Sequence, residues 1–372
     1  MTLYPCMGKQ SEQMQPVLRA PEGNDPGNAS PLRVGIIGCG RIVEEGHARA
    51  FRDNSSRVEV VALADPSPER LRIVGESLDV PEEGRFADYK RMLAQTELDL
   101  VDLALPHFLH EEVTVYAAEQ GVAILSEKPL STSLESVDRI LRAVEENDVR
   151  LGVYHNYKWM PAFAKAKELI EEGRIGQPFL VRFEYLGGGH YPGAQGYDPD
   201  WRTKAVRAGG GCLLDNGYHF CYLAEWLMGS PVESVYGRVG TFVQQQDVDD
   251  LALLLLSHAN GAISSIQFSW AVKSGGERAS EVYGTEGTLR FRWGEQPLAL
   301  YENRVGEWAY PEVDADAHSF SALLGEFLTA FRTGGPMPVS GEEARHNLAI
   351  VKAGYESSQR GMPVSVAELL HA

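Results

Sequence analysis

The first half of the chain alternates short apolar runs with amphipathic segments. Apolar runs of this length, bounded by turn residues, are typical of strands buried on both faces, and apolar residues at helical spacing fill the segments between them. The predicted strands are residues 32–40, running into a glycine turn, then 58–65, 98–106, 122–126 and 150–156. The predicted helices are 43–51, 68–78, 89–95, 109–120 and 134–146. This alternation predicts an α/β fold, a doubly wound parallel sheet with helices on both faces.

The pattern changes after about residue 156. A helix over 161–172 precedes a strand over 179–186, a glycine-rich stretch over 187–211 and a helix over 213–227. Five further strands have no helices between them and predict a mainly antiparallel sheet, at 235–244, 251–257, 262–270, 280–283 and 288–293. Helices over 319–332 and 341–360 close the chain. We expect a loose tail over 1–31, a first α/β domain over 32–155 and a second over 156–372, whose last helices can pack back on the first.

The charge balance narrows the possible ligands. The 372 residues include 34 basic and 52 acidic side chains, a net charge of −18. Such a surface repels phosphate backbones and anionic lipids, which disfavours nucleic acids and membranes as partners, although one basic pocket suffices for a small anion. None of the four cysteines forms a CxxC pair, and no apolar stretch approaches the roughly 18 residues of a membrane span. We expect a soluble, cytoplasmic protein without a bound metal.

A glycine turn follows the first predicted strand. The sequence GCGRIV at residues 38–43 matches the dinucleotide-binding pattern G-x-G-x-x-[G/A] except at its end, where Val43 is larger than the preferred small residue. In that pattern the second glycine lets a pyrophosphate approach the backbone at a helix N-terminus. By itself the motif is also compatible with a tight turn that binds nothing.

Asp65, at the end of the second predicted strand, supports the nucleotide interpretation. It follows Gly40 by 25 positions, near the usual spacing of the acid that accepts the ribose hydroxyls. A carboxylate there repels a 2′-phosphate, which favours NAD over NADP. The alternative is a helix cap before the sequence Pro-Ser-Pro. The predicted cofactor contacts at this end are Gly38, Gly40, Arg41, Ile42 and Asp65.

Glu127-Lys128-Pro129 ends the fourth predicted strand. Ligands of parallel sheets bind beyond the carboxyl ends of the strands, so we expect Lys128 in the crevice where a nicotinamide would lie. A partly desolvated lysine beside a cationic ring has a lowered pKa, which suits it to hydrogen-bond a substrate oxygen and pass on its proton. The alternative is a surface lysine paired with Glu127.

Asp215 and His219 lie four residues apart in a second cluster, GGGCLLDNGYH. On a helix they share one face, so the carboxylate could orient the imidazole and raise its basicity, as in many general-base sites. A metal site is disfavoured because no third ligand is near in sequence. The alternative is an aspartate at a helix N-terminus with an unrelated buried histidine.

These motifs, in this order, resemble the Gfo/Idh/MocA superfamily of oxidoreductases, which includes glucose–fructose oxidoreductase and inositol dehydrogenase. The resemblance covers residues 33–364 and rests on VGIIGCGRI, ALPHFLH, SEKPL, GVYHNYKWMPAF, EEGRIGQP, DPDWR, AGGGCLLDNGYH and GEEARHNLAIVKAGYESSQRG. It implies an N-terminal Rossmann domain and a C-terminal α/β domain with a large, open, mostly antiparallel sheet. A homodimer or homotetramer formed through that sheet is also implied.

The resemblance implies hydride transfer between NAD(P) and a hydroxyl carbon of a sugar or cyclitol. Lys128 would contact the reacting hydroxyl, His219 would be the acid or base, and Asp215 would be its partner. The nicotinamide pocket would be lined or ordered by Pro106, His110, Glu127 and Lys128, and Asn156 would lie near the substrate.

The sequence departs from the family pattern at three places. Lys158-Trp159 replaces a common Arg-Phe, so a planar guanidinium becomes a point charge in substrate recognition. His107 follows Pro106 where a small polar residue is commoner, and Val43 replaces a small residue in the glycine turn. These changes affect the expected geometry of substrate and cofactor but leave the proposed catalytic residues in place.

The stretch 187–211 is the expected source of substrate choice. Aromatic rings can stack on the apolar face of a sugar, and an arginine can bind a carboxylate or phosphate. The candidates are His190, Tyr191, Tyr197, Asp200, Trp201, Arg202 and Lys204, with Trp201 and Arg202 favoured as substrate contacts. The alternative is a loop packed on its own aromatics, with Arg202 paired to Asp200.

Three functions remain open from the sequence. The favoured one is an NAD(P)-dependent dehydrogenase acting on a secondary hydroxyl of a sugar, polyol or cyclitol, with NAD as the preferred cofactor. A second is an enzyme of the same family that oxidises a sugar transiently, cleaves a glycosidic bond and returns the hydride. A third is a non-catalytic sensor of a dinucleotide or sugar, which is disfavoured because Lys128, Asp215 and His219 are all present.

Overall fold

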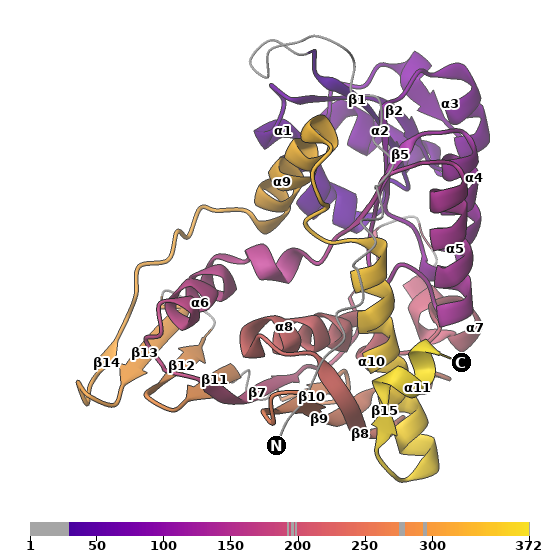
Figure 1. Ribbon diagram of the computed structural model, residues 1–372. Helices are drawn as coiled ribbons and strands as arrows, with labels where there is room; N and C mark the ends of the chain where they lie inside the picture. The colour runs from indigo at the N-terminus through magenta and orange to yellow at the C-terminus, as the bar shows by residue number, and fades with distance from the viewer. Residues whose placement is uncertain are drawn as a thin grey trace, which may run out of the picture.

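A computed structural model describes residues 30–191, 193–194, 197, 199–274, 280–292 and 296–371. It contains two β-sheets with helices around and between them (Figure 1). The predicted tail over 1–31 lies outside the described residues up to residue 29, as does the end of the predicted strand 288–293. The described helices include none long and apolar enough to cross a membrane.

The N-terminal sheet has six parallel strands in the order β3-β2-β1-β4-β5-β6, which confirms the doubly wound fold. Its strands are β1 (Leu32–Ile37), β2 (Val58–Ala64), β3 (Arg85–Phe86), β4 (Leu100–Leu103), β5 (Ala123–Ser126) and β6 (Leu151–Val153). The helices are α1 (Ala48–Asp53), α2 (Pro68–Ser77), α3 (Tyr89–Gln95), α4 (His110–Glu119) and α5 (Leu134–Glu146). Strand β4 is buried along its whole length, as expected for a central strand covered on both faces.

The C-terminal sheet has nine strands in the order β14-β13-β12-β11-β7-β10-β9-β8-β15, antiparallel except for β7 beside β10. Its strands are β7 (Pro178–Leu186), β8 (Val232–Gly240), β9 (Leu251–His258), β10 (Ile263–Ser269), β11 (Ser280–Gly284), β12 (Gly287–Phe291), β13 (Leu298–Glu302), β14 (Trp308–Ala309) and β15 (Val364–Ser365). The helices are α6 (Pro161–Glu171), α7 (Ala205–Ala208), α8 (Tyr218–Met228), α9 (Ser319–Thr333), α10 (Gly341–Arg360) and α11 (Val366–Leu370).

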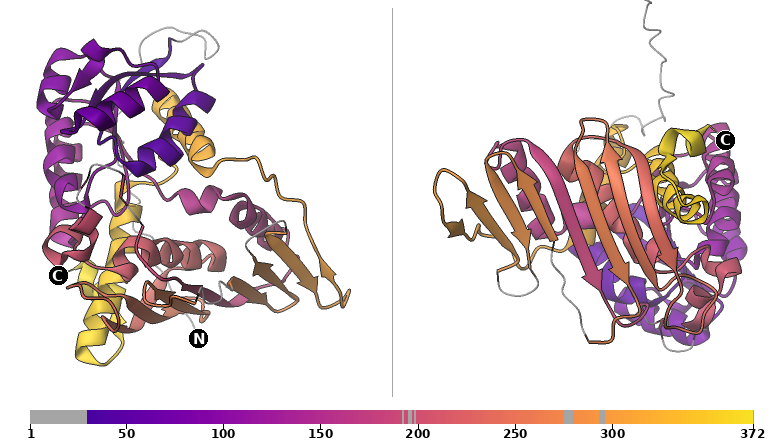
Figure 2. Two further views of the ribbon diagram at one scale, coloured as in Figure 1. Left: turned by 180° about the vertical axis from the view of Figure 1, so that it is seen from behind. Right: turned by 90° about the horizontal axis from the view of Figure 1, so that it is seen from below.

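Helices cover one face of this sheet, and the other face is open (Figure 2, right). The open face carries large apolar side chains: Tyr236 on β8, Leu255 on β9 and Ile263 on β10 are 39%, 47% and 45% exposed. Leu255 pairs directly with Tyr236 across the β8–β9 ladder. Strand β9 therefore presents leucines to both faces, whereas a strand with one solvated face usually alternates apolar and polar residues.

The last helices return to the N-terminal sheet. Helix α9 packs beside α1 (Figure 1), and the Arg57 side chain donates a hydrogen bond to the Gly325 carbonyl on α9 at 2.9 Å. Helix α10 packs against α5, where Arg345 forms an ion pair with Asp138. These contacts join residues more than 200 positions apart in sequence and hold the last helices against the N-terminal sheet and its helices.

Two π-helical turns replace the starts of predicted helices. Val43–His47 precedes α1, and Leu213–Gly217 precedes α8. A π-helical turn holds more residues than an α-helical turn, so side chains four apart no longer align on one face. Both turns lie beside the cleft, and the second changes the position of a predicted catalytic residue.

Candidate active site

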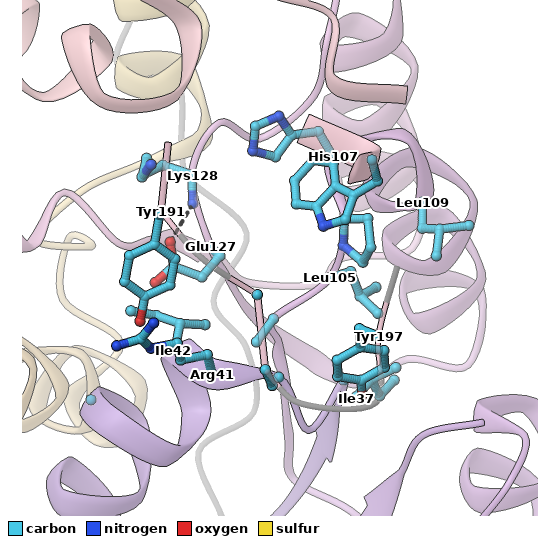
Figure 3. A pocket seen from close by; sticks show the side chains of 18 of the residues that line it. Ile37, Arg41, Ile42, Leu105, His107, Leu109, Glu127, Lys128, Tyr191 and Tyr197 are labelled. Atoms are coloured by element: carbon cyan, nitrogen blue, oxygen red, sulfur yellow. Dashed lines mark hydrogen bonds between the residues drawn. The ribbon is translucent and has the colours of Figure 1, made fainter. Parts of the chain in front are cut away.

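A cleft of about 820 Å³ opens between the glycine turn, the carboxyl ends of the parallel strands and the stretch 187–211. In Figure 3, Arg41, Glu127, Lys128 and Tyr191 lie on one side of it, and Leu105, His107 and Leu109 lie on the other. Tyr197 and Ile37, the last residue of β1, also line the cleft (Figure 3). The volume falls in the range of small-molecule and cofactor sites.

The two glycines of the glycine turn, Gly38 and Gly40, have different roles. Gly38 has a φ of +95°, and a Cβ there would lie 2.3 Å from the Ala104 carbonyl oxygen, so this position serves the tight turn. A Cβ on Gly40 would meet no atom within 4 Å, which leaves its backbone open to a ligand in the cleft. This is the arrangement that a pyrophosphate needs to approach the backbone, and it fits the predicted dinucleotide.

Asp65 is buried beside this glycine turn. Its Oδ2 accepts a hydrogen bond from the Cys39 backbone N–H at 2.7 Å, and its Oδ1 accepts one from Ser67 N–H at 2.8 Å. The alternative role of helix cap belongs to Ser67, whose Oγ accepts from Arg70 N–H at the start of α2. Asp65 also lines the cleft, where its carboxylate can accept ribose hydroxyls and repel a 2′-phosphate.

Two tyrosines of the stretch 187–211 reach across to the nucleotide half of the cleft. The Tyr197 hydroxyl donates to Asp65 Oδ2, and the Tyr191 hydroxyl donates to Glu45 Oε2 at 2.5 Å. The guanidinium of Arg41 lies over the Tyr191 ring, 4.9 Å from its centroid. These two tyrosines of the stretch expected to select the substrate therefore contact Arg41 and Asp65, two residues predicted to hold the cofactor.

Glu127 belongs to a buried cluster of charged side chains with His47 and Asp102. His47 is fully buried, with its Nδ1 2.7 Å from Asp102 Oδ2 and its Nε2 3.0 Å from Glu127 Oε1. Burial alone would lower the pKa of His47, but the two carboxylates outweigh it and raise the pKa to about 10, so the ring is an imidazolium. The other Glu127 oxygen accepts from the Lys128 backbone N–H at 3.0 Å. The cluster thus fixes the backbone that presents Lys128.

Lys128 and Asp215 meet at the far end of the cleft. The Lys128 Nζ lies 2.8 Å from the Asp215 backbone oxygen and 3.4 Å from its Oδ1. Arg202 Nε lies 3.3 Å from Asp215 Oδ2, an ion pair without hydrogen-bond alignment. Burial alone would raise the pKa of Asp215, but Lys128 and Arg202 outweigh it and bring the pKa to about 2. The carboxylate is therefore ionised and shared between two cations.

The sequence predicted that Asp215 pairs with His219, but in the structure the two side chains have other partners. The π-helical turn over Leu213–Gly217 carries Asp215 toward Lys128, whereas His219 Nδ1 lies 2.7 Å from the Tyr222 hydroxyl. His219 is 5% exposed and lines the cleft beside Lys128 and Asp215. Burial, and then the charge of Lys128, lowers its pKa, so the imidazole is neutral at physiological pH. The three residues are brought together, but through different contacts.

Among the other predicted residues, Pro106, Asn156, Trp201 and Arg202 line the cleft, as do Gly38, Gly40, Arg41, Ile42, Asp65 and Glu127. Two do not. Lys158 turns away to Glu343, with its Nζ 2.5 Å from the Glu343 Oε1, which also lies 3.2 Å from His155 Nδ1. His110 is buried behind the strand ends, where its Nε2 donates to the Leu105 carbonyl at 2.9 Å. Asp200, the alternative partner of Arg202, has no described side chain.

His107 takes the place in the cleft that was expected for His110. Its Nδ1–H donates to the Ala208 carbonyl at 2.9 Å, and its ring meets Trp201 edge to face with centroids 4.9 Å apart. Burial lowers its pKa to about 3, so the ring is neutral. His107 and Trp201 thus form an aromatic wall in the lining of the cleft that also contains Lys128 and Asp215.

Sequence reasoning missed His47 and Tyr222. His47 lies among polar residues of a predicted helix and has no motif of its own. Its only signal is its place in the first turns after the glycine motif, facing the ends of β4 and β5. Tyr222 follows His219 by three positions, the spacing of neighbours on an α-helix, and that spacing was a usable signal.

The parallel sheet, the glycine turn and the acid at the end of β2 define a dinucleotide-binding protein of the Rossmann type. A family model described as "Oxidoreductase family, NAD-binding Rossmann fold" matches residues 32–155. A second, "GFO/IDH/MocA C-terminal domain", matches residues 163–290. The chain belongs to the GFO/IDH/MocA oxidoreductase family, which confirms the resemblance drawn from its motifs.

Individual relatives agree with this assignment. A D-apiose dehydrogenase from Rhizobium rhizogenes is 28% identical over 92% of this chain and 100% of its own length. An NAD-dependent scyllo-inositol 2-dehydrogenase from Bacillus subtilis is 28% identical over 90% of this chain and 96% of its own. Among solved structures, an oxidoreductase from Agrobacterium radiobacter in complex with NAD+, L-tartaric acid and magnesium has a TM-score of 0.78. It shares 26% identity, covering 91% of this chain and 99% of that one.

Proposed function

We propose that this protein is an NAD-dependent dehydrogenase that oxidises a secondary hydroxyl of a sugar, polyol or cyclitol. The observation that carries the proposal is the meeting of Lys128, Asp215 and His219 at one end of a cleft whose other end is the glycine turn. The sugar and cyclitol dehydrogenases among its relatives support this substrate class. The aromatic wall of His107 and Trp201 gives the apolar face of such a substrate a surface to pack on.

Bound NAD would be held by Gly40, Arg41 and Asp65 and would supply the hydride acceptor. The neutral imidazole of His219 takes the hydroxyl proton as the alcohol is oxidised. The Lys128 ammonium hydrogen-bonds the reacting oxygen and stabilises the negative charge that develops on it. Asp215, ionised between Lys128 and Arg202, holds the ammonium in place.

The assay that tests this proposal measures reduced cofactor. Purified protein is incubated with NAD, or in parallel with NADP, and a panel of sugars, polyols and cyclitols, and the absorbance of the reduced cofactor is followed. We expect turnover with one class of substrate and a higher kcat/KM with NAD, because the Asp65 carboxylate repels a 2′-phosphate.

Two other outcomes would favour the alternatives. Release of a sugar from a glycoside without accumulation of NADH would indicate the hydride-returning glycosidase. Binding of NAD without turnover on any member of the panel, together with capture of a partner protein, would indicate a sensor. Either result would contradict the dehydrogenase proposal.

We also propose that two copies associate through the open face of the C-terminal sheet. Leu255, Tyr236 and Ile263 form an exposed apolar surface over the neighbouring strands β8, β9 and β10, and surfaces of this kind mark interaction sites. A face that pairs with a second copy explains why β9 carries leucines on both sides. The proposed compartment is the cytoplasm, in agreement with the buried thiols of Cys39, Cys212 and Cys221, which form no disulfide among the described residues.

A further inference from the structure

Arg202 brings a second cation to the end of the cleft that holds Lys128 and Asp215. Its Nε lies 3.3 Å from Asp215 Oδ2, but the two atoms are not aligned for a hydrogen bond. Both atoms are buried, and neither has a hydrogen-bond partner among the described residues. The guanidinium therefore has hydrogen-bonding capacity that a ligand in the cleft can use.

Aromatic rings hold the Arg202 guanidinium in place. Its Cζ lies 4.3 Å from the centroid of the Trp201 ring and 5.5 Å from that of the Tyr191 ring. Trp201 in turn meets His107 edge to face, and His107 is bonded to the Ala208 carbonyl. A planar guanidinium held in this way loses little conformational freedom when it binds a ligand. Its fork of N–H groups matches the two oxygens of a carboxylate.

The charged side chains around Lys128 balance one another within the protein. They form a row in which each member contacts the next, with three cations and three anions. The row is Arg202, Asp215, Lys128, Glu127, His47 and Asp102. The imidazoles of His219 and His107 are neutral and leave this balance unchanged. The oxidised nicotinamide of bound NAD adds one positive charge, so a substrate with one negative charge restores the balance.

The positions of the two cations relate this negative charge to the reacting hydroxyl. Lys128 Nζ lies 3.4 Å from Asp215 Oδ1, and Arg202 Nε lies 3.3 Å from Oδ2 of the same carboxylate. A hydroxyl bonded to Lys128 and an anion bonded to Arg202 are therefore close together on the substrate. The ionised Asp215 repels a phosphate, with about two negative charges, more strongly than a carboxylate with one.

We propose that the substrate is a sugar acid, whose carboxylate binds Arg202 while a nearby hydroxyl binds Lys128. The proposal rests on the dehydrogenase function above and narrows its substrate class to aldonic and uronic acids. The net charge of the chain is −18, so its surface as a whole repels such an anion. Binding then depends on the two cations that line the cleft.

The test compares acids with neutral partners of the same stereochemistry. The pairs are D-gluconate with D-glucitol, D-galactonate with galactitol, and D-glucuronate with D-glucose, and D-glucose 6-phosphate represents the phosphates. In the wild type we expect kcat/KM for at least one acid to exceed that for its neutral partner by about tenfold or more, the effect of a hydrogen bond between charged groups.

Variants of Arg202 assign this preference to the guanidinium. In Arg202→Gln the ratio of the two kcat/KM values should approach one, and in Arg202→Lys, which keeps the charge without the fork, it should be intermediate. The ratio within one variant cancels any change in the chemistry at Lys128, because both members of a pair react there. The control Arg72→Gln removes an exposed charge on α2 and should keep the wild-type ratio.

Calorimetry measures the same preference without turnover. Each pair is titrated in the presence of NAD into His219→Gln, which removes the proposed base and leaves the charge unchanged because the His219 ring is neutral. We expect the preferred acid to bind about tenfold or more tightly than its neutral partner. Adding Arg202→Gln should abolish the difference.

Four results would overturn the proposal. The neutral partners bind as tightly as the acids, or the acid preference survives Arg202→Gln. Arg202→Gln weakens NAD binding and leaves the acid preference unchanged, which would assign Arg202 to the phosphates of the cofactor. D-glucose 6-phosphate binds more tightly than every acid. Failure of the dehydrogenase function is seen separately, as binding of an acid to a wild type that turns over no member of the panel.

Discussion

Replacing His47 with glutamine removes the cation between two buried carboxylates. In the wild type, Asp102 and Glu127 raise the pKa of His47 to about 10, against about 6.5 in an unfolded chain. By linkage, that difference stabilises the folded protein by about 4 kcal/mol at pH 7. The value agrees with the 3–5 kcal/mol typical of breaking a buried ion pair. Because Glu127 also holds the Lys128 backbone, turnover should fall with stability.

The raised pKa of His47 also predicts how the stability difference changes with pH. A raised pKa in the folded state stabilises fully below about pH 6.5, and the effect is lost as the pH rises through about 10. The unfolding free energies of the wild type and His47→Gln, measured in urea, should therefore differ most below about pH 6.5 and converge toward pH 10. The control is His258→Gln, a buried histidine bonded to Ser230 and Ser264, where no carboxylate is bonded to the ring. A pH-independent difference, or one below about 1 kcal/mol, would refute the buried imidazolium.

Further predictions concern the nucleotide end and the open sheet. Gly40→Ala should keep the unfolding free energy of the wild type but weaken NAD binding, measured by calorimetry, at least tenfold. Gly38→Ala should lower the unfolding free energy, because its Cβ would meet the Ala104 carbonyl. Equal effects of the two substitutions would contradict the assigned roles. Asp65→Asn should lower the NAD-to-NADP ratio of kcat/KM by about tenfold, because the charge that repels a 2′-phosphate is lost; an unchanged ratio would assign cofactor choice to other residues. If two copies associate through the open face as proposed, Leu255→Glu should give a monomer in sedimentation velocity without changing the circular dichroism, and an unchanged mass would contradict that interface.

The sequence predicted the elements whose local signals agree with their packing. The helices Tyr89–Gln95, Leu134–Glu146 and Gly341–Arg360 have the predicted bounds, because N-capping residues and an apolar face both mark them. Lys128 and Asp65 line the cleft because both follow parallel strands, whose carboxyl ends meet at one edge of the sheet. The short strands β3, β13, β14 and β15 were missed, since two to five residues give little periodic signal.

The site contacts were harder to predict because they depend on tertiary structure. An α-helical spacing placed Asp215 beside His219, but a π-helical turn moved it to Lys128, and nothing in the local sequence marks that turn. Lys158 was expected in the cleft, but Glu343, 185 positions away, draws it elsewhere. The domain boundaries at 31 and 155 stay predictions.

The most direct test of the catalytic assignment is the turnover of Lys128→Met, measured together with its NAD dissociation constant. The substitution keeps most of the length of the side chain and removes the charge at the reacting oxygen. We expect turnover to fall by a factor of about 10² to 10³ while NAD still binds within threefold of the wild type. Lys165→Met, which changes a half-buried lysine on α6 outside the cleft, should keep the turnover of the wild type. Turnover within a few-fold of the wild type in Lys128→Met would contradict the account.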